Sequence, residues 1–159
     1  TLDRSSAASD VYKRQNLDLR IRAIGGSQRM ILGDRRVDLD DWRSSFNEAE
    51  AMNLDRFVDH VQAEHLPHAV LIDCTADPGV AEQYAEWLQR GIHVITPNKR
   101  AHSVPVEYYA GLKQISHEAN AHFLYEATVG SGLTVIQTLK DLVETGDEIE
   151  SISGIFSGT

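Results

Sequence analysis

The sequence predicts an α/β fold in which helices cover both faces of a parallel β-sheet. Short runs of β-forming residues alternate with helical patterns along the 159-residue chain. The apolar run at 69–72 is typical of a strand that is buried on both faces. Because right-handed crossovers join the strands in such an alternation, the sheet is expected to be parallel and doubly wound. Ligands of these sheets bind beyond the carboxyl ends of the strands.

The first part of the chain is expected to contain one strand and a long helical region. Residues 17–24 alternate apolar and polar side chains, which predicts a strand that ends at Gly25 and Gly26. Residues 37–66 have a mostly helical pattern with a break near Asn53. The buried strand at 69–72 follows.

The remainder of the chain continues the alternation. Asp77 is suited to cap a helix and Pro78 to occupy its first position, while Gly91 is suited to follow its last residue, Arg90. The same patterns predict strands at 93–96, 122–125 and 151–156, and helices at 105–119 and 133–144. The order is therefore five strands separated by helices.

The composition is that of one globular domain. Hydrophobic residues make up 42% and charged residues 25%, which excludes global disorder. A net charge of −9 lacks the basic footprint of a nucleic-acid-binding protein, so no nucleic-acid partner is expected. No run of about 18 apolar residues occurs, so no membrane partner is expected.

Cysteine and histidine usage points to no structural disulfide or metal site. Cys74 is the single cysteine, so no internal disulfide can form, and a cytoplasmic location fits. His60, His65 and His68 are spaced by five and three residues without a cysteine nearby. They are expected on the surface or at helix ends rather than on a metal.

The turn after the first strand is a candidate nucleotide site. It contains Gly25 and Gly26, but the chain has no Gly-x-Gly-x-x-Gly fingerprint. Ser27 and Arg29 suit the 2′-phosphate of NADP, whereas an acidic residue there would suit the ribose hydroxyl of NAD. The alternative is a plain glycine turn with a solvated arginine.

Two further candidates follow the strands at 69–72 and 93–96. Small residues after Asp73 could approach a ribose or a nicotinamide closely. Cys74 could be a nucleophile, but no histidine is close in sequence to activate it. The favoured interpretation of Cys74 is therefore a small buried residue. Lys99, in Thr-Pro-Asn-Lys, could donate a proton to a developing alkoxide, which is worth roughly 10²–10⁴-fold in rate. On these residues alone, a solvated lysine beside Arg100 is favoured.

A glycine-containing turn at 126–133 is the last candidate. Its glycines could let backbone carbonyls or amides converge on an ion. The alternative is an ordinary tight turn between a strand and a helix.

Taken together, these segments resemble homoserine dehydrogenase, in particular the form that is fused to an aspartate kinase. The resemblance runs over residues 17–159 and is carried by the order and spacing of several motifs. These are Asp-Cys-Thr at 73–75, Ala-Glu-Gln-Tyr at 81–84, His-Val-Ile-Thr-Pro-Asn-Lys at 93–99, Leu-Tyr-Glu-Ala-Thr-Val-Gly-Ser-Gly-Leu at 124–133 and Ser-Gly-Ile-Phe-Ser-Gly-Thr at 153–159.

The resemblance implies an NAD(P)-dependent oxidoreductase of threonine and methionine biosynthesis. Such an enzyme reduces aspartate 4-semialdehyde to homoserine with NADPH or NADH. It also implies that Lys99 is catalytic and that further residues bind the nucleotide. The implied cofactor-binding residues are Ser27, Arg29, Cys74, Thr75, Ala76, Thr96, Asn98 and Lys99.

The resemblance further implies a monovalent cation, Na⁺ or K⁺, and a substrate segment. The implied cation ligands, mostly backbone carbonyls, are Glu126, Val129, Ser131 and Leu133; Ser131 stands where the family is expected to have alanine. Glu126, Gly158 and Thr159 are implied to bind substrate. The parent enzyme is implied to be a homo-oligomer.

The resemblance also implies how the chain is divided. Residues 16–146 would be a partial Rossmann NAD(P)-binding domain that lacks its first strand, and residues 147–159 would begin the substrate domain. Residues 1–15 are interpreted as a sequencing or assembly artefact, because 10–15 resembles a translated adapter end; a disordered native tail is the alternative.

Two other functions remain open from the residues. One is another NAD(P)-dependent dehydrogenase on the same fold, and the other is a non-catalytic nucleotide-binding module. Oxidation of another substrate in place of homoserine would favour the different dehydrogenase. Nucleotide binding without homoserine oxidation would favour the non-catalytic module.

The 159-residue chain is predicted to be marginally stable by itself, to bind cofactor poorly and to be inactive as an enzyme. The first strand of a doubly wound sheet is central, and its absence would leave about ten backbone groups unpaired at about 1 kcal/mol each. Whole domains are stable by only about 5–15 kcal/mol. Thermal unfolding checks this prediction, and a cooperative transition above about 45 °C would contradict it.

Overall fold

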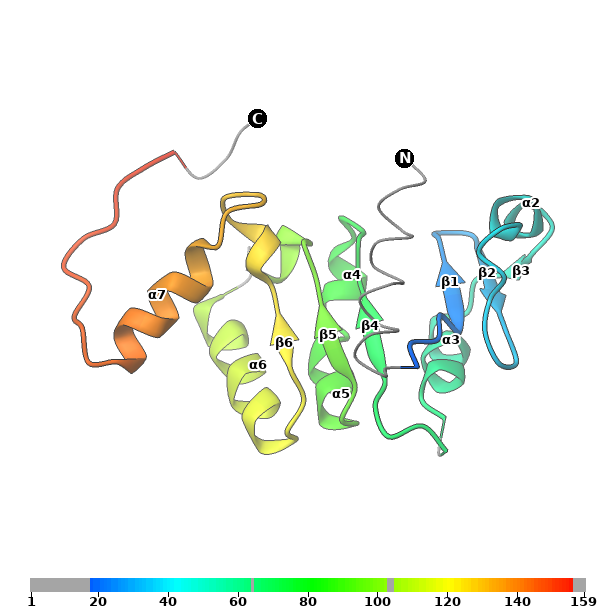
Figure 1. Ribbon diagram of the computed structural model, residues 1–159, viewed down its shortest axis with the longest axis horizontal. Helices are drawn as coiled ribbons and strands as arrows, with labels where there is room; N and C mark the ends of the chain where they lie inside the picture. The colour runs from blue at the N-terminus through cyan, green and yellow to red at the C-terminus, as the bar shows by residue number, and fades with distance from the viewer. Residues whose placement is uncertain (1–17, 64, 103–104, 156–159) are drawn as a thin grey trace. The chain divides into compact units, whose positions relative to one another are not determined.

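The computed structural model describes residues 18–63, 65–102 and 105–155. Predictions for residues 1–15, Gly158 and Thr159 therefore lie outside the described residues. The chain divides between Ala63 and Glu64 into two compact units. Each unit has its own three-stranded sheet (Figure 1).

The sheet of the first unit is antiparallel. Its order is β1 (Ala23–Gly25), β2 (Arg29–Leu32) and β3 (Glu50–Ala51). The predicted strand at 17–24 is confirmed only at its end, and β1 pairs with β2 in a hairpin whose turn is closed by a 2.9 Å hydrogen bond from Gly26 N to Arg29 O. A turn this short can join only antiparallel strands, so β2 is a strand that the prediction missed.

The helical region predicted at 37–66 is interrupted by a strand. It contains α2 (Trp42–Asn47), then β3, then α3 (Leu54–Val61). The predicted break near Asn53 is confirmed, because Asn53 Oδ1 accepts a 2.9 Å hydrogen bond from Arg56 N and caps α3. The prediction missed β3 because a two-residue strand depends on its neighbour and leaves no period in the sequence.

The sheet of the second unit is parallel. Its order is β4 (Val70–Ile72), β5 (His93–Ile95) and β6 (Phe123–Leu124), which confirms three of the predicted strands. The connections contain α4 (Pro78–Ala81), α5 (Tyr84–Gln89), η1 (Lys99–His102) and α6 (Val106–Glu118). After β6 come η2 (Glu126–Thr128) and α7 (Val135–Glu144).

One face of this parallel sheet forms the core of the unit. Leu71, Val94 and Phe123 occupy paired positions and are buried, as are Leu88 of α5 and Leu112 of α6. Both crossovers proceed in the same direction along the sheet, so right-handedness places α5 and α6 on the same face.

The other face of β4 departs from the prediction. Val70 and Ile72 alternate with buried Leu71, and Ile72 is 66% exposed. The expectation of a strand buried on both faces is therefore wrong for this unit. The reason is that an apolar run shows what a strand can bury, whereas the crossover helices decide which face is covered.

Two other predicted elements are corrected. The helix expected from Asp77 to Arg90 is two helices, α4 and α5, that meet at Glu82 and Gln83. The predicted cap is confirmed, since Asp77 Oδ1 accepts a 2.7 Å hydrogen bond from Gly79 N. Residues 151–155 form no strand, although one was expected at 151–156; they are exposed and no described strand pairs with them.

None of the helices in the described ranges is long and apolar enough to span a bilayer.

Gly130 and Gly111 provide a matched test of the backbone of the second unit. Gly130 has φ +71°, and an added Cβ would lie 2.9 Å from Val135 Cγ2, whereas a Cβ on Gly111 would meet nothing within 4 Å. Gly130→Ala is expected to reduce the free energy of unfolding by about 1–3 kcal/mol. Gly111→Ala is expected to raise it by up to about 1 kcal/mol, because alanine favours the helix. Urea unfolding of both variants measures the two effects, and equal effects would refute this account.

Candidate functional site

The carboxyl ends of β4, β5 and β6 lie at one edge of the parallel sheet (Figure 1). This edge contains the residues after each strand, from Asp73, Thr96 and Tyr125 onward. It therefore brings together three of the four predicted site segments. The fourth, at Ser27 and Arg29, belongs to the first unit.

A buried polar network occupies the ends of β4 and β5. Asp73, Tyr84, Thr96 and Asn98 are each at most 5% exposed. Asp73 Oδ2 accepts hydrogen bonds from the Tyr84 hydroxyl and, at 3.0 Å, from Asn98 Nδ2; Asp73 Oδ1 accepts one from Thr75 N at 2.8 Å. A buried carboxylate needs such donors, because an unpaired charge in the interior is very costly.

Thr96 joins the network to the backbone of both strands. Its hydroxyl donates to Asp73 O at 3.1 Å, accepts from Asn98 N at 2.8 Å and lies 2.9 Å from the Tyr84 hydroxyl. The two strand ends are thereby held together by side chains as well as by the sheet.

The network keeps one carboxylate charged and one phenol neutral. Burial by itself would raise the pKa of Asp73, but the hydrogen bonds from Tyr84, Asn98 and Thr75 outweigh it and hold that pKa below its usual value. Burial, and then the hydrogen bond to Asp73, raise the pKa of the Tyr84 phenol. Both groups therefore stay in the protonation states that the hydrogen bonds require at neutral pH.

Asn98 determines where Lys99 begins its short helix. Asn98 Nδ2 donates to Asp77 O at 3.0 Å, and Asn98 Oδ1 accepts from Arg100 N at 3.0 Å. Lys99 is the first residue of η1 and is exposed. The lysine thus stands at the sheet edge on a turn whose preceding residue is fully buried.

The segment after β4 is an exposed shelf of small residues. Cys74, Thr75 and Ala76 are all exposed. The favoured expectation of a buried Cys74 is therefore wrong, since Leu71 and Asp73 take the inward positions and Cys74 points the other way. The shelf lies beside the Asn98–Lys99 turn, because Asn98 Nδ2 is 3.5 Å from Thr75 Oγ1.

The turn at 126–133 is built around a helix cap. The two carboxylate oxygens of Glu126 each accept a 2.9 Å hydrogen bond, from Ile136 N and Gln137 N at the start of α7. Gly130 and Ser131 both have positive φ, +71° and +56°. The carboxylate of Glu126 thus stabilises α7, and any ligand would compete with these amides for it.

The predicted cation ligands lie within this one turn. Glu126 opens η2, Val129 follows it, and Leu133 N donates to Gly130 O at 3.1 Å. Ser131 lies between them in the left-handed conformation. Neither this turn nor any other part of the described ranges contains a group of three or more His, Cys, Asp or Glu side chains that could hold a metal ion.

Ser27 and Arg29 belong to the β1–β2 hairpin. Ser27 is in the turn, and the Arg29 guanidinium donates a 2.6 Å hydrogen bond to Ala49 O. Both residues are exposed. The arginine therefore has a backbone partner and is accessible to solvent.

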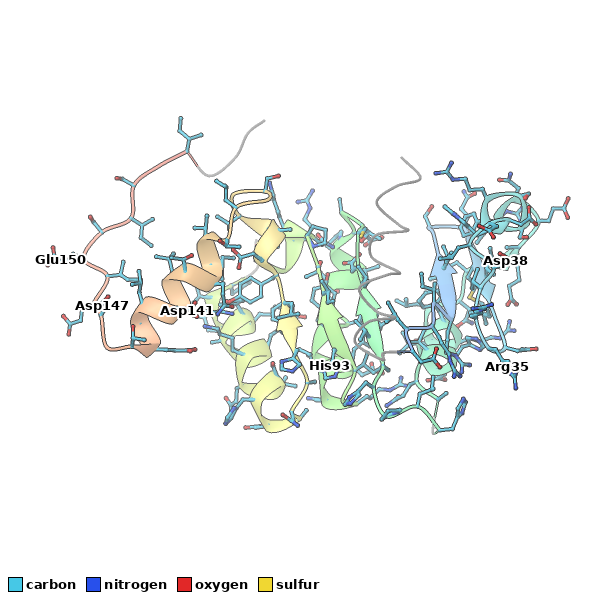
Figure 2. The ribbon with its side chains drawn as sticks, viewed as in Figure 1. Arg35, Asp38, His93, Asp141, Asp147 and Glu150 are labelled. Carbon is cyan, nitrogen blue, oxygen red and sulfur yellow. The ribbon has the colours of Figure 1, made fainter. Side chains whose placement is uncertain are left out.

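The histidines lie where they were expected, on the surface or at a helix end. His65 and His68 are exposed. His60 is in the last turn of α3, and its Nε2 lies 2.9 Å from Gly33 O. His93, at the amino end of β5 (Figure 2), stacks between His68 and His122. Burial, and then repulsion from these two rings, lower the pKa of His93.

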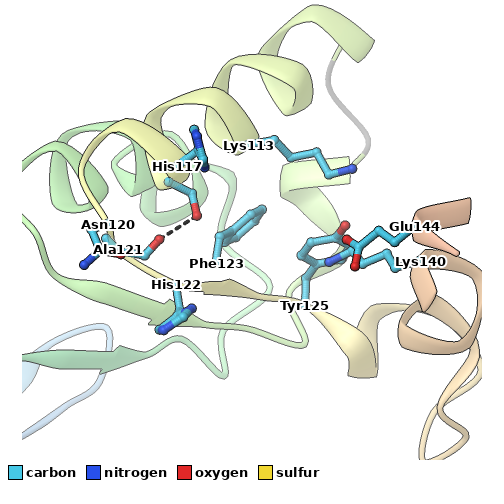
Figure 3. Close-up of a pocket in the computed structure, with 10 residues that line it drawn as sticks. Lys113, His117, Asn120, Ala121, His122, Phe123, Tyr125, Lys140 and Glu144 are labelled. Carbon is cyan, nitrogen blue, oxygen red and sulfur yellow. Dashed lines mark hydrogen bonds between the residues drawn. The ribbon is translucent and has the colours of Figure 1, made fainter.

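A separate pocket of about 350 Å³ lies beside β6. Figure 3 shows Lys113 on α6 and Lys140 on α7 on either side of Tyr125. The Lys140 ammonium is 4.6 Å from the centre of the Tyr125 ring. None of the residues of the buried network lines this pocket, so it is distinct from the edge formed by β4 and β5.

Sequence reasoning missed Tyr84 as a site residue. The tyrosine begins α5 and its hydroxyl reaches the end of β4, eleven residues earlier in the chain. Its only sequence signal was its place within one of the resembling motifs. Periodicity identifies an inward-facing tyrosine but not the partner of its hydroxyl.

The geometry of the β4–β5 edge suits a nicotinamide nucleotide. Small exposed residues at 74–76 leave room for a flat ring, and backbone groups there are accessible. A lysine on a rigid turn stands beside them. The class of protein that this fold and edge define is a nucleotide-binding α/β domain of the doubly wound type.

Comparison with known proteins gives the family. The sequence model described as "Homoserine dehydrogenase, NAD binding domain" matches residues 8–126. The chain belongs to this family. The members of this family are NAD(P)-dependent oxidoreductases, and the matched residues belong to the NAD-binding domain.

Two curated relatives and one solved structure illustrate the similarity. The chain is 50% identical over 154 residues to the chloroplastic bifunctional aspartokinase/homoserine dehydrogenase 1 of Zea mays, covering 96% of this chain and 17% of the relative. It is 41% identical over 124 residues to the homoserine dehydrogenase of Schizosaccharomyces pombe, covering 77% and 33%. A hyperthermophilic archaeal homoserine dehydrogenase in complex with NADPH has the same fold, with a TM-score of 0.62, 24% identity, and coverage of 82% and 42%.

The chain spans only part of the length of these relatives. It spans 17% of the maize protein and 33% of the fission-yeast protein. The similarities therefore identify the family and the type of domain, and the activity of the whole protein is a proposal.

Thr96→Val tests the buried network. Valine keeps the shape but removes the hydroxyl that bonds Asp73 O and Asn98 N. Leaving buried polar groups without a partner costs about 1–3 kcal/mol each, so the free energy of unfolding is expected to fall by at least about 2 kcal/mol. Thr138→Val is the control, since it removes a hydroxyl that bonds Thr134 O on the exposed side of α7. A loss no larger than that of the control would contradict the network.

Proposed function

We propose that this chain is the nucleotide-binding part of an enzyme that reduces aspartate 4-semialdehyde to homoserine with NADPH or NADH. The observation that carries the proposal is the Asn98–Lys99 turn, which a buried network holds at the edge of the sheet in a chain of this family. The homoserine dehydrogenase names of the maize and fission-yeast relatives support the substrate.

The residues of the β4–β5 edge account for the electrostatics of such a reaction. The nicotinamide supplies the hydride when it is bound. As a carbonyl carbon accepts hydride, its oxygen gains negative charge, and the Lys99 ammonium stabilises that charge. Thr75 and Asn98 would line the nicotinamide side, together with Cys74 and Ala76 of the shelf, and Thr96 would contribute from the buried end of β5. The hydrogen bonds of Asn98 to the buried network would favour near-attack geometry by limiting the positions open to the turn.

NADP is the proposed preference over NAD. Ser27 and Arg29 would bind the 2′-phosphate, and the exposure of both side chains supports this assignment. The archaeal structure named above was solved with NADPH, which is consistent with it.

A monovalent cation, Na⁺ or K⁺, is proposed at the turn of residues 126–133. Backbone carbonyls of Glu126, Val129, Ser131 and Leu133 would be the ligands. The proposal is supported by the positive φ of Gly130 and Ser131, which turns successive peptide groups to one side. Substrate binding by Glu126, Gly158 and Thr159 is proposed on the resemblance alone.

The domain boundaries, the partners and the location of the whole protein are also proposed. Residues 16–146 are assigned to the nucleotide domain and 147–159 to the start of the substrate domain. We expect a homo-oligomer with small-molecule partners and without nucleic-acid or membrane partners. A cytoplasmic location remains a prediction, and the maize relative is named chloroplastic.

Lys99→Ala tests the proposed chemistry in the whole enzyme. Loss of a positioned acid is expected to lower kcat for NADP-dependent homoserine oxidation by roughly 10²–10⁴-fold. Lys113→Ala is the matched control, because Lys113 lies on α6 over the ring of Tyr109 and outside the β4–β5 edge. Steady-state kinetics with homoserine and NADP measure both variants.

The same assay separates the alternatives. Unchanged turnover in Lys99→Ala would remove the lysine from the mechanism. Nucleotide binding without homoserine oxidation in the unmodified enzyme would favour a non-catalytic module, and oxidation of another substrate would favour a different dehydrogenase.

A further inference from the structure

Tyr84 has no role in the chemistry proposed above, although its side chain is fully buried in the network. Its ring packs against Trp87 and Phe123, with centroid distances of 5.7 and 5.8 Å. Phenylalanine would make the same ring contacts without a hydroxyl. A hydroxyl in this position costs free energy unless it is hydrogen-bonded.

The Tyr84 hydroxyl bridges the ends of two strands. It donates to Asp73 Oδ2, just after β4, and lies 2.9 Å from Thr96 Oγ1, just after β5. The same two atoms hold Asn98: Asp73 Oδ2 accepts from Asn98 Nδ2 at 3.0 Å, and Thr96 Oγ1 accepts from Asn98 N at 2.8 Å. The tyrosine is therefore linked to the Asn98 side chain through Asp73 Oδ2, and its oxygen lies beside Thr96 Oγ1, which accepts from the Asn98 backbone amide.

We infer that Tyr84 and Asp73 are positioning residues for the reaction, which act by holding the Asn98–Lys99 turn in place relative to the exit of β4. The inference rests on the proposed function, since it bears on catalysis through Lys99. A misplacement of about 1 Å can cost about 10²-fold in rate, so the location of the turn matters as much as the identity of the lysine.

The first test is amide hydrogen exchange on the full 159-residue chain. In Tyr84→Phe, exchange of the Asn98 and Arg100 amides is expected to accelerate about tenfold, the factor that corresponds to about 1.4 kcal/mol. The amides of Leu88 and Leu112 serve as internal references for global unfolding. Asp73→Asn is a second variant, because it keeps the shape and places an amide where Tyr84 and Asn98 donate.

Tyr108→Phe is the matched control. Its hydroxyl also donates a hydrogen bond, 2.7 Å long, to Ala81 O, but it makes no contact with the network. Exchange at Asn98 and Arg100 is expected to be unchanged in this variant. If Tyr84→Phe and Asp73→Asn accelerate these amides no more than Leu88 and Leu112, the inference is overturned.

The second test is a double-mutant cycle in the whole enzyme. Tyr84→Phe is expected to lower kcat about tenfold while changing the KM for NADP less, and to have little further effect once Lys99 is alanine. Equal losses of kcat with and without Lys99 would indicate a structural role only and would overturn the inference.

The two tests separate the inference from the proposed function. If the whole enzyme does not oxidise homoserine, the proposed function fails, and the exchange measurement still decides whether Tyr84 holds the turn. Faster exchange at Asn98 and Arg100 then supports the positioning role of Tyr84, and unchanged exchange refutes it.

Discussion

The candidate site depends on one buried charge, the carboxylate of Asp73. A carboxylate in the interior is tolerated only with several donors, and here a phenol, a side-chain amide and a backbone amide supply them. Each donor comes from a different part of the second unit. Satisfying the carboxylate therefore also determines where α5 begins, how β4 ends and where the turn before Lys99 lies.

This arrangement separates binding from positioning. Cys74, Thr75 and Ala76 are exposed at the edge and available to a ligand, whereas Asp73 beside them is buried and committed to the protein. The alternation of the strand continues through Asp73 and Cys74, which places these two neighbours on opposite sides. One short segment can thus both line a nucleotide site and anchor its support.

The glycine turn at 126–133 is also organised by a carboxylate that accepts hydrogen bonds, that of Glu126. The Glu126 carboxylate accepts two amide hydrogen bonds at the amino end of α7, where the helix dipole favours a negative charge. It links the end of β6 to the helix that follows. The backbone carbonyls of the turn, rather than this carboxylate, are therefore the groups best suited to a cation.

The sequence by itself determined the parallel sheet of the second unit, the cap at Asp77, the helix break near Asn53 and the edge that forms the candidate site, because period and capping are local properties. Only the tertiary structure decided that β1 pairs with β2, that Ile72 is exposed and that Cys74 faces outward. It also revealed the buried partners of the Tyr84 hydroxyl. These features depend on which distant segment lies opposite, and the chain pattern of a single segment carries no record of its neighbour.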